Sequence, residues 1–417
     1  MAPLTQAPKG TLDTLPADSF LLRKIENQMI NIAENFGFKE IRTPTFEHTE
    51  LFCRSVGDTT DVVQKEMYTF EDKGGRSITL RPEGTAGAMR AVVEHGLTNE
   101  PMPLKLFYLL SCFRHEKPQA GRLREFHQFG AELLGSSSPK ADAEVILLAD
   151  SLLSSFEIGE YSLEINSLGC KQCRPLYTDK LKAYFKENQA DLCDTCKGRL
   201  EKNPLRILDC KSPVCKSIAA KAPKITSFLC DDCANHYSEV KNALSSVGVS
   251  FTENPDIVRG LDYYNRTVFE FISNGLGAQS TVCGGGRYDG LVSQLGGNDC
   301  ASLGFGLGIE RLVSLYKLSH PEKDVLSPKI FIASIGDKAA TEAFKITNKL
   351  RAKNIFAECD IVGRSLKAQM KYADKLGASY SVVLGDDEIT SGKAVLKNMI
   401  NGEKKEILLQ NLEEEII

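Results

Sequence analysis

Two long apolar strands, over residues 105–114 and 125–135, are joined by a polar loop. Strands that follow one another through a short connection pair as an antiparallel hairpin. Because side chains alternate across a strand, Gln128 and Glu132 share one face of the second strand, with a glycine between them, and Phe129 lies on the other face. The sequence therefore predicts an antiparallel sheet that carries polar groups on one face.

The rest of the chain indicates an α+β fold in two domains. Apolar residues at helical spacing predict a helix over 21–36, and FKEIRTPTFE is expected to form a short strand that ends at Pro44. After a turn at Gly74 and Gly75, strands that alternate with loops are expected up to residue 135. Over about 168–250 the sequence pattern changes from strands to cysteine pairs and short helices. This change indicates an insertion in a first domain that covers 1–325. Beyond a proline-containing linker, residues 326–417 alternate strands and helices in the manner of a small α/β domain with parallel strands.

The composition is that of an ordinary soluble protein, with 42% hydrophobic and 25% charged residues among 417. The first residues, MAPLTQAPKG, lack the features of a secretory signal, and no stretch has the roughly 18 apolar residues of a membrane span. We therefore expect a cytoplasmic protein with no membrane partner. The net charge of -4 hides a local excess, because residues 329–375 hold ten Lys/Arg against five Asp/Glu. Such an excess suits a partner rich in phosphate.

Eight of the thirteen cysteines form four pairs within the insertion. Three pairs have CxxC spacing, CKQC, CDTC and CDDC, and the pair in CKSPVC is wider. Two residues between thiolates is the spacing of zinc sites, and four pairs fit one or two tetrahedral sites. The alternative is that they are inert thiols in a reducing compartment. The candidate zinc ligands are Cys170, Cys173, Cys193, Cys196, Cys210, Cys215, Cys230 and Cys233.

Four segments combine glycines with charged or polar residues in strand-like surroundings. They are TLRPEGTAG at 79–87, FRHEKPQAGRLREFHQFGAE at 113–132, RGLDYY at 259–264 and GFGLGIERL at 304–312. A single arginine in such a segment is most often a solvated or ion-paired structural group. Together with GGGRYDG, however, the four segments in this order resemble the histidyl branch of the class II aminoacyl-tRNA synthetases, and the resemblance covers nearly the whole chain.

This resemblance implies a class II synthetase catalytic core with an antiparallel sheet over 1–325 and an anticodon-binding domain over 326–417. It also implies activation of L-histidine with ATP and Mg²⁺, transfer of histidine to tRNA(His), and a homodimer that pairs around the FKEIRTP strand. The expected phosphate-facing surface of the second domain lies around Arg364, Lys367, Lys371 and Lys375.

Adenylate formation brings a carboxylate against the α-phosphate of ATP, and two anions repel unless cations lie between them. Arginine suits this task, because its planar charged fork binds carboxylate and phosphate oxygens in defined geometry. By resemblance, Arg114 grips the α-phosphate and Arg259 bridges that phosphate and the histidine carboxylate, so these are the expected catalytic residues. Arg311 is expected to flank the adenine ring and the γ-phosphate, and the glycines make room for the flat base. The expected ATP-binding set is Arg114, Glu116, Arg122, Arg311, Gly304, Gly306 and Gly308.

Recognition of histidine requires an anion for its ammonium group and polar partners for both ring nitrogens. By resemblance, Glu83 serves the ammonium group with Thr85, Glu132 and Tyr264 meet the imidazole from two sides, and Tyr288 closes the pocket. A site that pairs both nitrogens rejects other amino acids by roughly 10⁴ without proofreading. The expected histidine-binding residues are Glu83, Thr85, Gln128, Glu132, Tyr263, Tyr264 and Tyr288.

Two other functions fit the same fold. One is a catalytically silent relative, such as the synthetase-like regulatory subunit of ATP phosphoribosyltransferase, and the other is a class II ligase for another amino acid. The first typically lacks the anticodon domain and loses motif residues, whereas this chain keeps Glu83, Arg114, Arg259 and Arg311. RGLDYY and Glu132 disfavour the second.

Overall fold

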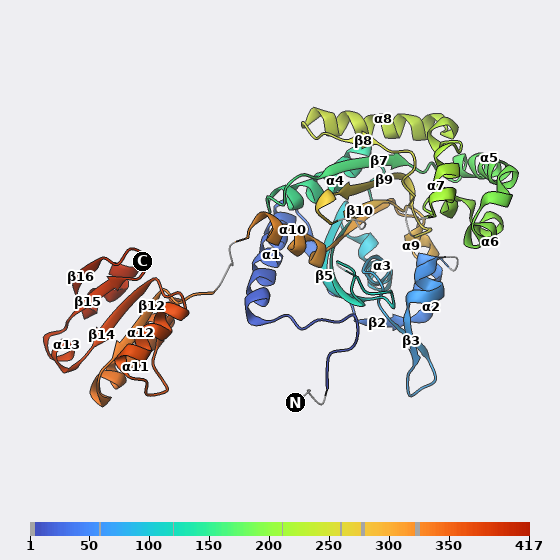
Figure 1. Ribbon diagram of the computed structural model, residues 1–417. Helices are drawn as coiled ribbons and strands as arrows, with labels where there is room; N and C mark the ends of the chain where they lie inside the picture. Colours follow the sequence, from blue (N-terminus) through green and yellow to red (C-terminus); the bar gives the residue numbers. More distant parts are fainter. Residues whose placement is uncertain are drawn as a thin grey trace. The chain divides into compact units, whose positions relative to one another are not determined.

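The computed structural model describes residues 5–57, 60–119, 121–210, 212–258, 261–276, 280–321 and 326–417. The chain divides into two compact units, Met1–Lys323 and Asp324–Ile417, and each unit has its own hydrophobic core. Figure 1 shows their helices and strands. Within the described ranges, no helix combines the length and apolar character needed to cross a membrane.

The first unit is built around a sheet of eight strands in its described part, in the order β1-β5-β6-β11-β10-β9-β7-β8. The strands are β1 (Lys39–Glu40), β5 (Leu104–Phe113), β6 (Glu125–Leu134), β7 (Ser162–Ser167), β8 (Thr252–Glu253), β9 (Asn265–Ile272), β10 (Thr281–Arg287) and β11 (Ser302–Gly308). Strands β5 and β6 pair antiparallel along their whole length, which confirms the predicted hairpin. The inner strands are all antiparallel to their neighbours, and the short edge strands β1 and β8 pair in parallel.

One face of this sheet is covered by long helices. They are α1 (Pro16–Asn35), α4 (Pro139–Ser154), α8 (Asp231–Ser246) and α10 (Ile309–Ser319). Helix α1 confirms the helix predicted over 21–36. Phe129 and Leu133 of β6 are buried in this main core. Because side chains alternate along the strand, Gln128 and Glu132 point to the opposite face.

That opposite face carries shorter elements. They are α2 (Thr49–Val56), α3 (Thr85–Glu94), α9 (Leu291–Gln294) and a small sheet of β2 (Phe46–His48), β4 (Ser77–Leu80) and β3 (Tyr68–Glu71). The prediction of strands and loops from residue 75 to residue 135 was wrong for α3, and helix α2 was not predicted. The sequence of α3, TAGAMRAVVE, is rich in good helix formers, but the glycines at 84 and 87 suggested a turn. The helix is stabilised by burial of Ala88, Met89 and Val92 against the sheet.

The cysteine-rich segment is helical. It contains α5 (Cys173–Glu187), α6 (Asp194–Lys202), α7 (Pro213–Ala220) and the start of α8. Helices α5 to α7, drawn in green in Figure 1, surround a small core of their own that includes Leu181, Phe185 and Cys196. The segment is therefore a compact module, with α8 leading back to the main core.

The second unit is a five-stranded sheet in its described part, in the order β13-β12-β14-β15-β16. Its elements are β12 (Ile330–Ser334), α11 (Asp337–Arg351), β13 (Ala357–Cys359), α12 (Leu366–Lys375), β14 (Tyr380–Leu384), α13 (Asp386–Ser391), β15 (Lys393–Asn398), β16 (Lys404–Leu408) and α14 (Leu412–Ile416). Strands β13, β12 and β14 are parallel, as predicted. The prediction did not include β15 and β16, which form an antiparallel hairpin on the sheet. Their charged, half-exposed sequence KAVLKN…KKEIL hides the strand pattern.

Candidate functional site

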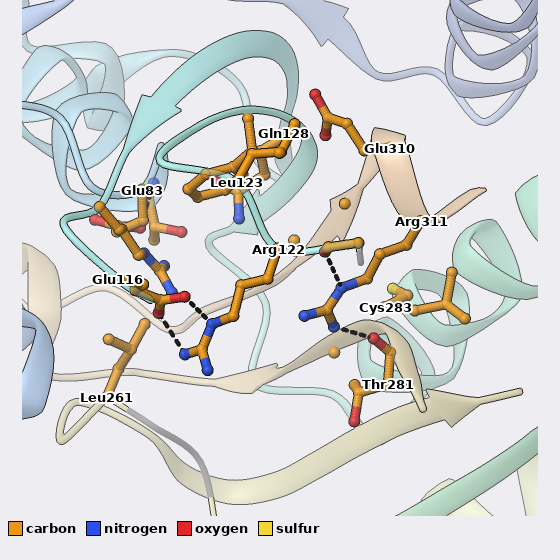
Figure 2. A pocket seen from close by; sticks show the side chains of 18 of the residues that line it. Glu83, Glu116, Arg122, Leu123, Gln128, Leu261, Thr281, Cys283, Glu310 and Arg311 are labelled. Atoms are coloured by element: carbon orange, nitrogen blue, oxygen red, sulfur yellow. Dashed lines mark hydrogen bonds and ion pairs between the residues drawn. The ribbon is translucent and has the colours of Figure 1, made fainter. Parts of the chain in front are cut away.

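A cavity opens on the polar face of the large sheet (Figure 2). Its walls come from the turn before α3, the loop between β5 and β6, the loop before β9, and strands β10 and β11. The residues that line it are Glu83, Thr85, Arg114, Glu116, Gly121, Arg122, Leu123, Phe126, Gln128, Leu261, Tyr263, Tyr264, Thr281, Val282, Cys283, Gly284, Gly306, Gly308, Glu310 and Arg311. Segments far apart in sequence thus converge on one cavity.

Three arginines line this cavity: Arg114 and Arg122 of the loop between β5 and β6, and Arg311 of α10. Arg114 donates from Nε to the Pro82 carbonyl at 2.8 Å, and its guanidinium lies over the Phe126 ring. Figure 2 shows Arg122 paired with Glu116, and Arg311 bonded to the backbone carbonyl of Thr281. Each guanidinium is therefore held in place by a contact to the protein.

The arginines also act on one another electrostatically. Burial lowers the pKa of Arg311, and the positive charges of Arg122 and Arg114 lower it further. Arg122 behaves in the same way, because burial and Arg114 both lower its pKa while Glu66 opposes them. A group of like charges held together in a partly buried cavity is stabilised by a bound anion.

Glu83 and Thr85 lie at the start of α3. The carboxylate of Glu83, whose side chain is only 3% exposed, accepts hydrogen bonds from the backbone N–H groups of Thr85 at 2.7 Å and Ala86 at 2.8 Å. Burial raises the pKa of Glu83, and these hydrogen bonds and Arg114 work against the increase. Gln128 accepts a hydrogen bond from the N–H of Gly84 at 3.0 Å and so fixes the same turn.

A buried polar chain leads from the cavity into the protein. The hydroxyl of Thr85 lies 3.3 Å from the hydroxyl of Tyr108, and Tyr108 donates to Oε1 of Glu132 at 2.9 Å. The other oxygen of Glu132 accepts from the Tyr288 hydroxyl. Burial raises the pKa of Glu132 to about 8, although the hydrogen bonds from Tyr288, Thr85 and Tyr108 lower it. A carboxyl group in this state holds a proton near neutral pH.

Three tyrosines pack around this end of the site. The rings of Tyr263 and Tyr264 have centroids 4.7 Å apart, and Tyr288 contacts both at 5.4 and 6.3 Å. Tyr263 and Tyr264 line the cavity, whereas Tyr288 lies behind them and is 1% exposed.

The glycines of β11 make room for side chains on β6. A Cβ atom at Gly304 would lie 1.8 Å from Oε2 of Glu132, and one at Gly306 would lie 2.4 Å from Nε2 of Gln128. At Gly308 a Cβ atom would make only ordinary contact with Arg311. The close approach at Gly304 and Gly306 therefore serves the acidic and amide side chains, whereas the sequence suggested space for a base.

Most of the site residues expected from sequence meet in this cavity. Glu132, Tyr288 and Gly304 do not line it and form the buried layer behind it. Arg259 lies outside the described residues.

Two polar residues of the site were missed at the sequence level. Tyr108 reads as an ordinary core residue of β5, yet its hydroxyl links Thr85 to Glu132. Glu310 follows the glycine strand, where its carboxylate accepts hydrogen bonds from the backbone N–H of His127 at 2.9 Å and pairs with its ring at 2.7 Å. The GIER motif was the signal that pointed to Glu310.

The eight cysteines of the insertion gather in two groups of four, as far as the described residues go. Cys170, Cys173, Cys230 and Cys233 form cluster 1, and Cys193, Cys196, Cys210 and Cys215 form cluster 2. Within each cluster the sulfur atoms lie within 4.8 Å of one another, with separations of 3.7 Å from Cys170 to Cys173 and 3.9 Å from Cys193 to Cys210. The thiols are free, not joined as disulfides.

The arrangement is matched in known proteins. A family model described as Histidyl-tRNA synthetase matches residues 10–172 and 216–312, and one described as Anticodon binding domain matches residues 329–417. The Histidine–tRNA ligase of Acetivibrio thermocellus is 54% identical over 412 residues, which cover 98% of this chain and 98% of that protein. The enzyme of the same name from Clostridium novyi is 53% identical over 414 residues, with the same two coverages of 98%.

A solved structure agrees with the sequence matches. The crystal structure of apo S. aureus histidyl-tRNA synthetase superposes with a TM-score of 0.84 at 39% identity, and the match covers 99% of this chain and 100% of that one. The antiparallel core and the second α/β unit are thus the class II fold with its anticodon-binding domain. On these matches and on its fold, the chain belongs to the histidyl-tRNA synthetase family.

Proposed function

We propose that this chain is a histidine–tRNA ligase. It activates L-histidine with ATP to histidyl adenylate and pyrophosphate, and it then transfers the histidyl group to the 3′ end of tRNA(His). The observation that carries the proposal is the meeting of Arg114, Arg122 and Arg311 in a cavity backed by Glu132 and three tyrosines. The first unit carries the catalytic site, and the second unit binds the anticodon.

Activation requires the histidine carboxylate to attack the α-phosphate as the bond to the pyrophosphate breaks. Arg114 binds the α-phosphate, and Arg259 bridges this phosphate and the attacking carboxylate, so the negative charge that develops meets fixed guanidinium groups. Arg114 is well placed for this role, because its contacts to Pro82 and Phe126 hold it at the cavity wall. The catalytic gain comes from positioning and charge.

ATP is held by the positive end of the cavity. Arg311 flanks the adenine ring and the γ-phosphate, with Glu116 and Arg122 in the loop between β5 and β6. Gly306 and Gly308 keep the cavity side of β11 free of side chains, and Gly304 lies behind them beside Glu132. The lowered pKa values of Arg311 and Arg122 support this role, since a polyphosphate relieves their mutual repulsion. Mg²⁺ would be shared with the ATP phosphates, because this ion retains waters and needs few protein ligands.

Histidine binds toward the tyrosines. Its ammonium group meets Glu83 and Thr85. The imidazole lies between Tyr264 and the hydrogen-bonded side chains that lead from Thr85 to Glu132. Gln128, Tyr263 and Tyr288 complete the pocket. The hydroxyls of Tyr108 and Tyr288 hold both oxygens of Glu132, which supports a fixed polar group at the closed end of the pocket. An amino acid without an imidazole cannot bond to these fixed polar groups and loses that part of the binding energy.

The anticodon contacts lie on α12 of the second unit. Lys367, Lys371 and Lys375 are exposed and four residues apart, so they form one stripe along the helix. Arg364 differs from them, because its guanidinium pairs with Asp360 at 2.7 Å and lies over the Tyr372 ring at 4.2 Å. The three lysines therefore bind phosphates, and Arg364 shapes the end of the stripe.

The functional form is a homodimer, paired through the region around the FKEIRTP strand. Phe46 of β2 and Phe70 of β3 are 56% and 47% exposed. Their partners on β4, Leu80 and Ile78, are two residues apart, so both phenylalanines lie on the same face of the small sheet. An apolar face of this kind supports burial against a second copy in a twofold dimer.

The two cysteine clusters hold structural zinc. A tetrahedron of Zn–S bonds of about 2.3 Å has edges of about 3.8 Å, which matches the separations of 3.7 to 3.9 Å between sulfur atoms. Four thiolates with no open position are the donor set of a closed structural site. Metal analysis of gently purified protein tests this assignment, which fails if no zinc is bound and chelators leave the melting temperature unchanged.

Charging of tRNA separates this proposal from a silent regulatory subunit. Both the retained anticodon-binding domain and the near-complete match to ligases favour catalysis. Purified protein with ATP, Mg²⁺, labelled histidine and tRNA(His) should give acid-precipitable histidyl-tRNA. Absence of any charged tRNA, with histidine still bound by the protein, would support the regulatory alternative. We also propose that the protein acts in the cytoplasm.

A further inference from the structure

The cysteine-rich segment contacts the loop that carries the pocket tyrosines. We name residues 170–233 the cysteine module and residues 261–264 the tyrosine loop. Arg174, the residue after Cys173, donates from its guanidinium to the backbone carbonyl of Tyr264. The first turn of α5 thus contacts the backbone of a residue that lines the cavity.

A second part of the module contacts the same loop at the side chain of Asp262, which belongs to the loop. Asn203 donates to Oδ1 of Asp262 at 3.2 Å, and Nε of Arg206 lies 3.8 Å from the same oxygen. Arg199 donates to the Arg206 carbonyl at 3.1 Å and joins these groups into one unit. All three residues lie between Cys196 and Cys210 of cluster 2.

Backbone hydrogen bonds join cluster 1 to the strand that follows the loop. The N–H of Arg266 donates to the Gly169 carbonyl at 2.9 Å, and the N–H of Leu168 donates to the Arg266 carbonyl at 2.7 Å. Gly169 precedes Cys170 directly. The module therefore contacts the tyrosine loop and the start of β9 at two places. One lies next to cluster 1, and the other lies on the segment between Cys196 and Cys210 of cluster 2.

The groups that contact the tyrosine loop lie on segments that the two clusters enclose along the chain. All four cysteines of cluster 2 lie in the sequence between the two pairs of cluster 1, so the clusters are nested along the chain. The core between them is small and consists mainly of α5 to α7. A small core of this size usually needs a metal or another cross-link to be stable. The family match omits residues 173–215, which include Arg174, Arg206 and all of cluster 2.

We propose that the cysteine module is a zinc-held clamp that positions the tyrosine loop for histidine, with Arg174 and Asn203 as its positioning residues. The inference rests on the proposed function, because it assigns histidine to the pocket that the loop lines. The loop has no helix or strand of its own, so ordering it costs conformational entropy. The clamp orders the loop in advance, and histidine then binds without that cost. The guanidinium groups that hold ATP are fixed by other contacts, to Pro82, Glu116 and Thr281.

The first experiment measures histidine and ATP binding to the full chain by calorimetry. Arg174→Ala should raise the Kd for histidine about tenfold or more, the scale for loss of a charge-assisted hydrogen bond. The Kd for ATP, the zinc content and the melting temperature should stay near wild-type values. Arg174→Lys should recover part of the affinity, and Lys180→Ala, which removes an exposed charge from the same helix, is the matched control. An unchanged Kd for histidine in Arg174→Ala, or a parallel loss of ATP affinity, would overturn the proposal.

Asn203→Ala provides a milder variant if Arg174→Ala fails to fold. It removes the hydrogen bond that the neutral amide of Asn203 donates to the carboxylate of Asp262, and it should weaken histidine binding by about threefold or more with ATP binding unchanged. Equal histidine affinity in this variant and the wild type would overturn the role of Asn203 in the clamp.

The second experiment tests the metal. Wild-type protein should bind about two zinc ions per chain, one for each set of four thiolates. Cys193→Ser should reduce this to about one and raise the Kd for histidine more than the Kd for ATP, whereas Cys300→Ser outside the module should change neither. Wild-type protein without zinc, or loss of zinc with unaltered histidine affinity, would contradict the clamp. Failure of the ligase proposal can be distinguished from failure of the clamp proposal. If the ligase proposal is wrong, the wild-type protein binds histidine but catalyses no histidine-dependent exchange of pyrophosphate into ATP.

Discussion

Glu132 and Tyr288 form a buried hydrogen-bonded pair behind the cavity, with the hydroxyl of Tyr288 donating to the carboxylate. Glu132 lies on β6 and Tyr288 directly follows β10, 156 positions later in the sequence. Glu132 is fully buried, and Tyr108 binds its other oxygen. The pair therefore sets the polarity of the closed end of the proposed histidine pocket.

Glu132 should make the stability of the protein depend on pH. Burial raises its pKa to about 8 in the folded protein, compared with about 4.3 for an exposed glutamate. Between these values the folded state holds a proton that the unfolded state has lost, so this contribution is complete below pH about 4 and is lost as the pH rises to about 8. In Glu132→Gln, which cannot ionise, the decrease in melting temperature between pH 5 and 8 should be smaller than in the wild type.

The exposed Glu100→Gln serves as the control for this measurement. Melting curves of the three proteins in matched buffers give the comparison. If Glu132→Gln and wild type lose melting temperature equally over this pH interval, Glu132 does not carry a proton in the folded state.

Substitution at Gly304 should disrupt the buried layer behind the cavity. A Cβ atom there would lie 1.8 Å from Oε2 of Glu132 and 2.4 Å from the carbonyl oxygen of Ala131. The backbone contact cannot be relieved by rotation of a side chain, so Gly304→Ala should destabilise the protein by about 2 kcal/mol or more. Gly308→Ala on the same strand makes only ordinary contacts and should melt close to wild type. Thermal melting that ranks the two variants in the opposite order would contradict the strand geometry.

The hairpin and its two faces could be predicted from sequence, because strand periodicity is local. Gln128 and Phe129 occupy opposite faces for that reason alone. Helix α3 was missed because its glycine-flanked start imitates a turn, and its burial depends on the distant strand β5. The division of the cysteines into two clusters could not be predicted either. The sulfur of Cys170 lies near that of Cys230, sixty residues away in sequence, and all of cluster 2 lies between these two cysteines along the chain. Tyr108 acquires its polar role only when Thr85 and Glu132 meet it.

Arg259→Ala should separate catalysis from folding. If Arg259 bridges the carboxylate and the α-phosphate, its loss should slow adenylate formation by about 100-fold or more, on the scale seen when one stabilising group is removed from a transition state. The melting temperature should stay within a few degrees of wild type. Single-turnover formation of adenylate, followed alongside thermal melting, gives both quantities. A slow variant that also melts much earlier would indicate a structural role instead.

The central claim is that this cavity activates histidine, and exchange of labelled pyrophosphate into ATP tests it without tRNA. Each of the twenty amino acids is supplied in turn to wild-type protein with ATP and Mg²⁺. The account predicts exchange with histidine at a rate roughly 10⁴ times that with any other amino acid. Exchange driven equally well by another amino acid, or no exchange with histidine, would contradict it.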